Sequence, residues 1–156
     1  MTAVYLIHGF IGSGKSTLSR QVAEAAGAVR FSFDEWYLAL FAGTDRLGVM
    51  PDAERRVSRL IRLMWPEVAR AGADVVLDLG LWTRADREDT ALAAARVGAE
   101  PVLIEVTTTD AVALRRCALR NAVDRSAFVI DEGTYWSLRE GFEPCGSDEE
   151  RVTVRT

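Results

Sequence analysis

Residues 9–16 carry the strongest chemical signal in the chain. They read GFIGSGKS and match the pattern G-x-x-x-x-G-K-[S/T]. In this pattern the glycines let the backbone wrap closely around phosphate oxygens, and the backbone amides at the start of the following helix point at the anion. The lysine of this pattern, Lys15, reaches the β- and γ-phosphates of a nucleoside triphosphate, and the hydroxyl of Ser16 is a ligand of Mg²⁺. The residues expected to contact the triphosphate are Gly9, Ile11, Gly12, Ser13, Gly14, Lys15, Ser16 and Thr17.

Two aspartates follow predicted strands. Asp34 closes the strand expected over 29–33, and Asp78 follows the apolar run 75–77. The carboxyl ends of parallel strands line the ligand crevice of an α/β sheet. A carboxylate at Asp34 can orient an alcohol there and accept its proton during phosphoryl transfer, although the same side chain is also suited to cap the following helix. Asp78 is expected either in the Mg²⁺ shell or in contact with the acceptor, and the sequence leaves these alternatives open.

A pair of arginines lies near a segment expected to be flexible. Arg116 and Arg120 share one face of the helix predicted over 110–121. The planar guanidinium matches phosphate oxygens, so these two side chains suit a mobile lid that closes over a triphosphate. The segment 122–131 supplies the flexible part of that lid and holds a third candidate, Arg125. The alternative is a pair of solvated arginines on an amphipathic helix.

The residues just after Asp78 have two possible roles. Trp82, Arg84 and Arg87 offer an aromatic wall and cations at the crevice rim. They equally fit the start of a helix with exposed arginines.

The single histidine and the two cysteines give no sign of catalysis or metal binding. His8 is expected to be a structural residue at a strand end, and Cys117 and Cys145 are expected to be reduced and packed. Neither cysteine sits in a spacing typical of metal ligands.

Apolar periodicity predicts alternating strands and helices. Strands are expected over 4–7, 29–33, 74–79, 101–106 and, at an edge, 151–155. Helices are expected over 15–26, 34–41, 84–97, 110–121 and 132–142. A further long helix is expected after the loop 43–51, which is rich in helix-breaking residues, and Pro66 is expected to kink or split it. Thr83 caps the helix 84–97, with Asp86 completing a capping box. This alternation predicts one α/β domain with a mainly parallel sheet.

Composition and charge bound the class of protein. Of the 156 residues, 49% are apolar and 27% are charged, which is the balance of a globular domain. No apolar run approaches the roughly 18 residues that cross a bilayer, and no basic residue precedes the short apolar run at the start. We therefore expect no membrane span, no signal peptide and a cytoplasmic location. The net charge of −4 argues against a broad electrostatic grip on nucleic acid.

Together these features resemble the small P-loop kinases of the AAA_33 group, which are related to zeta toxin, chloramphenicol phosphotransferase and polynucleotide 5′-hydroxyl kinase. The resemblance rests on the phosphate loop, Asp34, Asp78-Leu79-Gly80, Arg116, Arg120-Asn121 and the aromatic tail 132–144. It implies a three-layer P-loop NTPase fold, with a five-strand parallel sheet in the order 2-3-1-4-5 and a lid over about 116–131, in one domain spanning 1–156. It also implies ATP and Mg²⁺ as cofactors, Asp34 as the general base and Arg120 as a phosphate contact from the lid.

The residues after Asp34 depart from the polynucleotide kinases of this group, which usually carry an arginine there to hold the acceptor strand. Here residues 35–40 read EWYLAL and are mostly aromatic and apolar. We therefore expect a small molecule with some apolar surface as the hydroxyl acceptor, and not nucleic acid. Two alternatives stay open: a polynucleotide or nucleotide kinase, and a nucleotide-binding switch or NTPase that acts on another protein.

Lys15, the only lysine of the chain, gives the first testable prediction. Lys15→Met removes a positive charge from the place where the triphosphate must be held. Turnover is expected to fall by about 100-fold or more, which corresponds to roughly 3 kcal/mol. ATP hydrolysis or kinase assays on variant protein shown to be folded by circular dichroism provide the measurement. A folded variant with a near-normal rate would contradict the phosphate-loop assignment.

Overall fold

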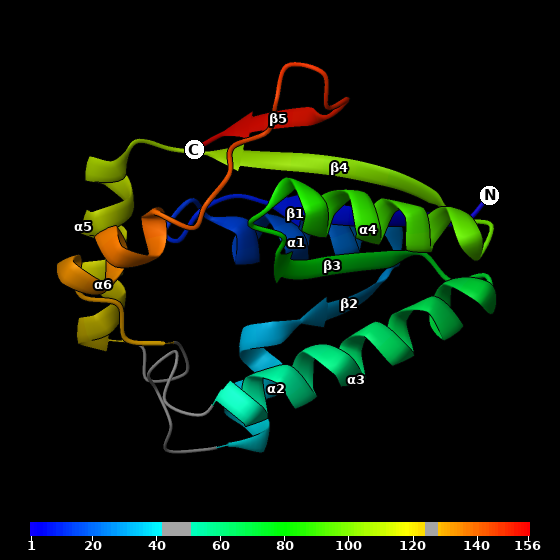
Figure 1. Ribbon diagram of the computed structural model, residues 1–156, viewed down its shortest axis with the longest axis horizontal. Helices are drawn as coiled ribbons and strands as arrows, with labels where there is room; N and C mark the ends of the chain where they lie inside the picture. Colours follow the sequence, from blue (N-terminus) through cyan, green and yellow to red (C-terminus); the bar gives the residue numbers. More distant parts are fainter. Residues whose placement is uncertain (42–50, 124–127) are drawn as a thin grey trace.

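A computed structural model describes residues 1–41, 51–123 and 128–156, which are built around one parallel sheet (Figure 1). The strands are β1 (Ala3–His8), β2 (Val29–Ser32), β3 (Val75–Gly80), β4 (Glu100–Thr107) and β5 (Val152–Arg155). Their order across the sheet is β2-β3-β1-β4-β5, and each neighbouring pair is parallel. The expected five-strand parallel sheet and its order are confirmed.

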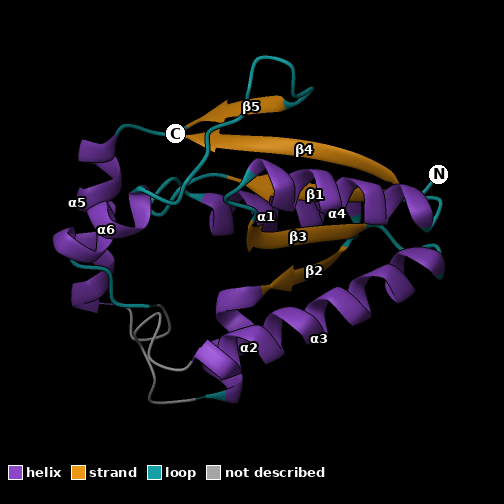
Figure 2. Cartoon of the chain, viewed as in Figure 1, coloured by secondary structure: helices purple, strands orange, loops and turns teal. Residues whose placement is uncertain are grey.

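Helices cover the sheet and gather beyond one of its ends. In the described residues they are α1 (Lys15–Ala26), α2 (Phe33–Leu40), α3 (Pro51–Arg70), α4 (Arg84–Arg96), α5 (Asp110–Val123) and α6 (Glu132–Arg139). Figure 2 shows α5 and α6 beyond the carboxyl ends of the strands, on the side where the strand arrows point. None of these helices is long and apolar enough to cross a membrane.

Both faces of the sheet are buried, as parallel sheets require. Side chains alternate between the two faces along a strand. In β1, Leu6 joins the larger core with Ile61 of α3 and Ala94 of α4, whereas its neighbour Ile7 joins a second core with Val22 of α1. The result is a helix–sheet–helix arrangement of three layers, with the connection from β1 to α1 at the carboxyl edge of the sheet.

The start of α2 settles one alternative for Asp34. The N-cap of α2 is Ser32, whose hydroxyl accepts a hydrogen bond from the Glu35 amide at 3.5 Å, and Asp34 lies in the first turn of the helix. The interpretation of Asp34 as the cap is therefore wrong, because the preceding serine already fills that position. The carboxylate of Asp34 is left available for other contacts.

Other element boundaries also differ from expectation. Pro66 lies inside α3, which remains one unbroken helix, so the expected break is wrong. Ile61, Trp65 and Ala69 on its inner face are all buried in the core, and that burial outweighs the hydrogen bond lost at the proline. The final helix α6 ends at Arg139 instead of residue 142. The predicted capping box of α4 is confirmed.

Residues 42–50 and 124–127 lie outside the described part of the chain. Most of the loop expected over 43–51 falls in the first segment. The second holds Arg125 and part of the expected lid, so the assignment of that arginine stays a prediction.

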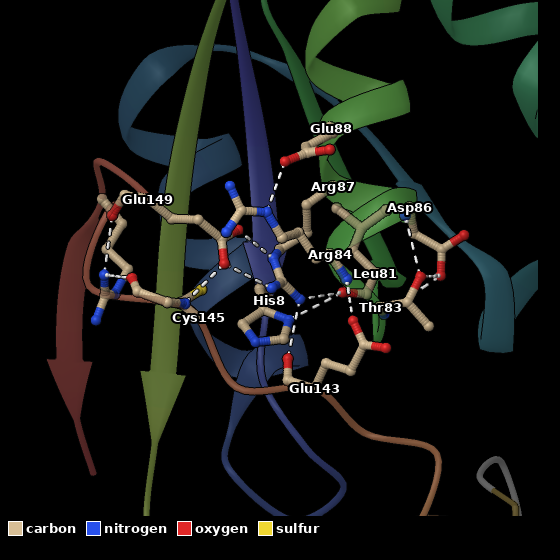
Figure 3. Close-up of polar contacts among 12 residues, drawn as sticks. His8, Leu81, Thr83, Arg84, Asp86, Arg87, Glu88, Glu143, Cys145 and Glu149 are labelled. Carbon is tan, nitrogen blue, oxygen red and sulfur yellow. Dashed lines mark hydrogen bonds and ion pairs between the residues drawn. The ribbon is translucent and has the colours of Figure 1, made fainter.

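Arg87 anchors the segment between α6 and β5 instead of lining a crevice rim. Its side chain is 2% exposed and forms a two-bond ion pair with Glu149, at 2.7 Å and 2.8 Å. It also donates to the backbone carbonyl of Glu143 at 3.0 Å (Figure 3). Arg84 pairs in a similar way with Glu88 and Asp148. The rim interpretation of these two arginines is therefore wrong, since both hold the tail against α4.

The buried Arg87–Glu149 pair gives a stability prediction. Glu149→Gln leaves the Arg87 guanidinium without its counter-ion, and we expect the free energy of unfolding near pH 7 to fall by roughly 3 kcal/mol. Hydrogen bonding from Arg87 lowers the pKa of Glu149 from 4.5 to about 2. The contribution of the pair is therefore fully present above about pH 4.5 and is lost as the pH falls through the range from 4.5 to 2.

Urea unfolding of the wild type and the variant at neutral and acid pH measures this difference. The gap between them is expected to shrink as the pH falls, because protonated glutamate resembles glutamine. Glu150→Gln is the matched control, since Glu150 is exposed and its change is expected to leave stability within about 0.5 kcal/mol of the wild type. Equal stability of Glu149→Gln and wild type at neutral pH would contradict the anchoring role.

Candidate active site

The phosphate loop is held in its shape by close backbone packing against α5. Gly12 has φ +76°, and a Cβ built at this position would lie 2.7 Å from the backbone oxygen of Ala113. No side chain fits in that space, so the loop approaches the helix as closely as a glycine permits. Gly14, at φ +94°, forms the N-cap of α1. The predicted strand–loop–helix context of the motif is present.

Lys15 is folded back onto its own loop. Its Nζ donates to the backbone carbonyl of Phe10 at 2.9 Å. Burial lowers the pKa of Lys15, and the nearby carboxylates of Asp78 and Asp34 oppose that shift. The two carboxylates offset only part of this effect of burial, so an added negative charge such as a phosphate would stabilise the ammonium further.

Asp34 belongs to the same group of charges. The residue as a whole is exposed, but the protein atoms around its carboxyl group desolvate that group and raise its pKa. Lys15 and Arg120 oppose the shift, while the negative charge of Asp78 adds to it. A carboxylate with a raised pKa is a stronger proton acceptor, as a general base must be.

Asp78 is held by a network that the sequence did not reveal. Its Oδ2 accepts from Arg30 Nη2 at 2.7 Å and lies 3.0 Å from the hydroxyl of Ser19. Arg30 Nε also donates to that hydroxyl at 2.7 Å, and Arg30 Nη1 pairs with Glu35 at 2.9 Å. One signal was available, since Arg30 is a charged residue within the short apolar strand predicted over 29–33.

Glu35, in the first turn of α2, is part of this network. It pairs with Arg20 of α1 as well as with Arg30. Burial alone would raise the pKa of Glu35, but the hydrogen bonds from Arg30 and Arg20 outweigh it and lower the pKa. These ion pairs join α1 to the start of α2, and so fix Asp34 relative to the phosphate loop.

The two candidate lid arginines meet the loop from α5. Arg116 Nη1 donates to the Gly12 carbonyl at 3.2 Å and to Thr156 Oγ1 at 2.8 Å. Arg120 Nη2 makes a long contact of 3.5 Å with the carbonyl of Phe128, and its Nε is buried without a hydrogen-bond partner in the described part of the chain. The structure thus brings both arginines to the edge where Lys15 lies.

The loop residues fit a triphosphate with its magnesium ion. Ser13 is 2% exposed, and within the described ranges its hydroxyl has no hydrogen-bond partner. Buried polar atoms are normally paired, so an orphaned hydroxyl in a glycine cradle suits an anion that supplies the missing partner. Ser16 is the second residue of α1, and the carboxylate of Asp78 acts electrostatically on Lys15. A hydroxyl and a carboxylate supply oxygen ligands, the type that Mg²⁺ prefers.

A cavity of about 250 Å³ lies between α3, α4 and the residues that follow β2 and β3. Phe33, which immediately precedes Asp34, contributes to its wall, and Trp82 lies in the wall as the sequence predicted. The remaining lining residues come from α3, α4 and the end of β3: Ser58, Arg62, Trp65, Leu79, Leu81, Asp86 and Thr90. The cavity is therefore a mixed surface of aromatic, aliphatic and hydroxyl groups.

Several known proteins share this fold. A kinase-assigned protein from Chloroflexus aurantiacus J-10-fl has a TM-score of 0.80 at 16% identity, covering 99% of this chain and 88% of that chain. A gluconokinase from Sinorhizobium meliloti 1021 has a TM-score of 0.63 at 19% identity, covering 98% and 82%. Kti12 from Chaetomium thermophilum, in complex with ADP-AlF3, has a TM-score of 0.69 at 14% identity, covering 97% and 88%. At these identities the likeness establishes the fold alone.

No curated protein matches the sequence. The AAA_33 family of AAA domains matches residues 4–145, a span that includes the phosphate loop, Asp34, Asp78, Arg116 and Arg120. The chain therefore belongs to the AAA_33 family and has the fold of the P-loop kinases.

Proposed function

We propose that the chain is an ATP- and Mg²⁺-dependent kinase that transfers the γ-phosphate of ATP to a hydroxyl group of a small molecule. The observation that carries the proposal is the convergence of Lys15, Asp34, Asp78 and Arg120, whose charges act on one another at the phosphate loop. This set combines two cations for a triphosphate with two carboxylates for a metal ion and a proton. A nucleotide switch has no need of a general base beside the γ-phosphate.

The nucleotide would be held by backbone amides and three side chains. The amides of residues 12–16 surround the β-phosphate, and the orphaned Ser13 hydroxyl donates to an oxygen of the triphosphate. Lys15 would exchange its bond to the Phe10 carbonyl for the β- and γ-phosphates, since a charged acceptor makes the stronger hydrogen bond. Arg120 would contribute its free Nε. The structure of Kti12 with ADP-AlF3 supports an adenine nucleotide at this fold position.

Mg²⁺ would be bound through the Ser16 hydroxyl and the carboxylate of Asp78. The ion supplies charge neutralisation between the β- and γ-phosphates. Asp78 has one oxygen fixed by Arg30 and Ser19, and this orientation supports contact with the metal through a bound water. The alternative of a direct contact between Asp78 and the acceptor has less support, because Asp78 is 7% exposed.

Asp34 would act as the general base. The acceptor hydroxyl gives its proton to the Asp34 carboxylate as its oxygen attacks the γ-phosphorus, and the bond from phosphorus to the β–γ bridging oxygen breaks with its electrons leaving on ADP. The raised pKa of Asp34 makes the carboxylate a better acceptor for that proton. Lys15 and Arg120 stabilise the charge that develops on the phosphoryl oxygens.

The cavity whose wall includes Phe33, the residue before Asp34, supports a small acceptor. Its walls combine two indole rings with the hydroxyls of Ser58 and Thr90, which suits an alcohol that has both an apolar face and further hydroxyl groups. Among the residues that the structure describes, Arg62 is the one cation in its lining, and it lies 3.8 Å from Asp86. A nucleic-acid strand would need several unpaired cations along its phosphates. The gluconokinase in the comparison makes sugar acids and polyols the first acceptors to test.

Acceptor specificity and the base are tested in one experiment. Labelled ATP and Mg²⁺ are incubated with the enzyme and a panel of neutral sugars, sugar acids, aryl alcohols and a 5′-hydroxyl oligonucleotide. We expect transfer to at least one small alcohol and none to the oligonucleotide. Asp34→Asn is expected to reduce transfer by about 100-fold or more with little change in ATP affinity, while Asp89→Asn, the same change at an exposed aspartate of α4, keeps the base.

The pH profile distinguishes a base from a positioning group. Because the pKa of Asp34 is raised, transfer should fall as the pH drops through that pKa, and this acidic limb should be absent from the residual activity of Asp34→Asn. Efficient labelling of the oligonucleotide would replace the small-molecule acceptor by a polynucleotide. Unchanged transfer in Asp34→Asn would remove the general base from the mechanism.

Arg120→Ala is expected to weaken ATP binding and to slow transfer together, by about 10-fold each, because the contact forms mainly in the closed state. Calorimetry with a non-hydrolysable ATP analogue and single-turnover kinetics provide the two measurements. Arg115→Ala is the control on the same helix, since Arg115 is exposed. Wild-type behaviour of Arg120→Ala would show that this arginine only packs against Phe128.

A further inference from the structure

Three potential metal ligands meet away from the phosphate loop. His8 ends β1, Glu105 lies in β4, and Cys145 belongs to the segment between α6 and β5. One ligand atom from each, an imidazole nitrogen, a carboxylate oxygen and a thiol sulfur, lies within 4.8 Å of the other two. The register of the sheet produces part of this cluster, because His8 and Glu105 are direct partners in the β1–β4 pair and so project to the same face.

His8 is already arranged as a ligand. Its Nδ1 lies 3.0 Å from the carbonyl of Leu81, and because a carbonyl can only accept, Nδ1 carries the proton and Nε2 keeps a lone pair. The residue is fully buried, and Nε2 has no hydrogen-bond partner among the residues that the structure describes. A ring nitrogen bonded to a backbone carbonyl on one side, with the other nitrogen free, is the arrangement that metal-binding histidines show.

The ring of His8 is also fixed in orientation. It stacks on Phe142 with 4.9 Å between ring centroids and an angle of 2° between the planes. Figure 3 shows Cys145 beside the imidazole, in the segment that Arg87 and Glu149 hold in place. The stacking thus holds the imidazole ring, and with it Nε2, in one orientation.

Glu105 is oriented by its own partners. Oε2 is 2.7 Å from Arg151 Nε and 3.3 Å from Thr153 Oγ1. Oε1 accepts a long bond of 3.4 Å from the amide of Cys145, which brings the thiol of that residue to the carboxylate. The side chain of Glu105 is therefore fixed through one oxygen while the other faces Cys145.

We propose that His8 Nε2, Glu105 Oε1 and Cys145 Sγ form a zinc-binding site. Nitrogen, sulfur and carboxylate donors are the set that Zn²⁺ selects, whereas Mg²⁺ and Ca²⁺ take oxygen ligands. Tetrahedral Zn²⁺ needs ligand atoms about 3.5 Å apart, so the three atoms, which lie within 4.8 Å of one another, need to approach further to share one ion. Three protein ligands leave one position for water.

The surrounding charges are compatible with a divalent cation. Arg87 and Arg151 lie closest, and each is paired with a carboxylate, Glu149 at 2.7 Å and Glu105 at 2.7 Å. Binding replaces the thiol proton of Cys145 by the metal, so the thiolate offsets one charge of the ion, and the Glu105 carboxylate is shared between the ion and Arg151. Bound zinc would tie the C-terminal segment to the end of β1, one residue before the phosphate loop begins.

The test uses the full chain, freed of metal with a chelator and kept in excess Mg²⁺ to occupy the phosphate-loop site. Zn²⁺ titration by calorimetry should give one equivalent per chain. Co²⁺ in its place should give the thiolate-to-cobalt charge-transfer absorption and the strong visible bands of a tetrahedral site. Because His8 is the only histidine, the imidazole ¹⁵N resonances need no assignment, and only that of Nε2 should shift strongly on Zn²⁺ binding.

Cys145→Ser is the decisive variant, because the residue is partly exposed and the change is close to isosteric. It should abolish the charge-transfer band and weaken Zn²⁺ binding by about 100-fold or more. Cys117→Ser, the matched control at the other cysteine, should retain both signals. The proposal is overturned if Cys145→Ser binds like the wild type, if the band is lost in Cys117→Ser instead, or if the Nε2 resonance does not move.

Discussion

The parallel pairing of β3 with both of its neighbours brings Asp78, Asp34 and the phosphate loop to one edge of the sheet. Ser32 of β2 is paired with Asp78 of β3, and His8 of β1 with Gly80. The residues that follow these pairs therefore leave the sheet at one edge. Asp34 follows β2, Asp78 lies near the end of β3, and the phosphate loop follows β1. A shift of one residue in either pair would turn the side chain of Asp78 to the opposite face.

Arg30 makes this register costly to change. It lies in β2, reaches Asp78 at 2.7 Å, and carries the ion pairs on to Glu35. Both side chains of the Arg30–Asp78 pair are largely buried, at 12% and 5% exposure. Breaking such a pair leaves a buried charge without compensation, so a misaligned β2 is penalised in energy. A charge that looks out of place in an apolar strand thus fixes the alignment of the site.

The same charges explain how the site accommodates a highly charged ligand. Without nucleotide, the carboxylates of Asp34 and Asp78 balance Lys15 and Arg120, whose charges act on the same small volume. An arriving triphosphate competes with these carboxylates for the cations. Its negative charge raises the pKa of Asp34 further by the same Coulombic effect that Asp78 already exerts. On the proposed mechanism, nucleotide binding itself strengthens the base.

Local sequence signals predicted the elements well, and failed where a partner lies far along the chain. The pattern around Lys15 and the capping box at Thr83 are both encoded within a few residues, and the structure has them as predicted. The sheet order followed from family resemblance, because strand periodicity carries no information about neighbours. The burial of Arg87 escaped prediction, since its partner Glu149 is 62 residues away. His8 and Cys145 were each interpreted as inert for the same reason, as only the folded chain brings them together.

The C-terminal segment completes the phosphate loop in a way that no motif encodes. Arg116 and Thr156 donate to the carbonyls of Gly12 and Ser13, at 3.2 Å and 2.8 Å. A carbonyl that faced the ligand would repel phosphate oxygens, so engaging these two oxygens elsewhere leaves the amides of the loop to face the anion. The last strand, β5, is therefore more than an edge of the sheet. Its pairing with β4 carries Thr156 to the loop, and the loop depends on that contact for the polarity of its inner surface.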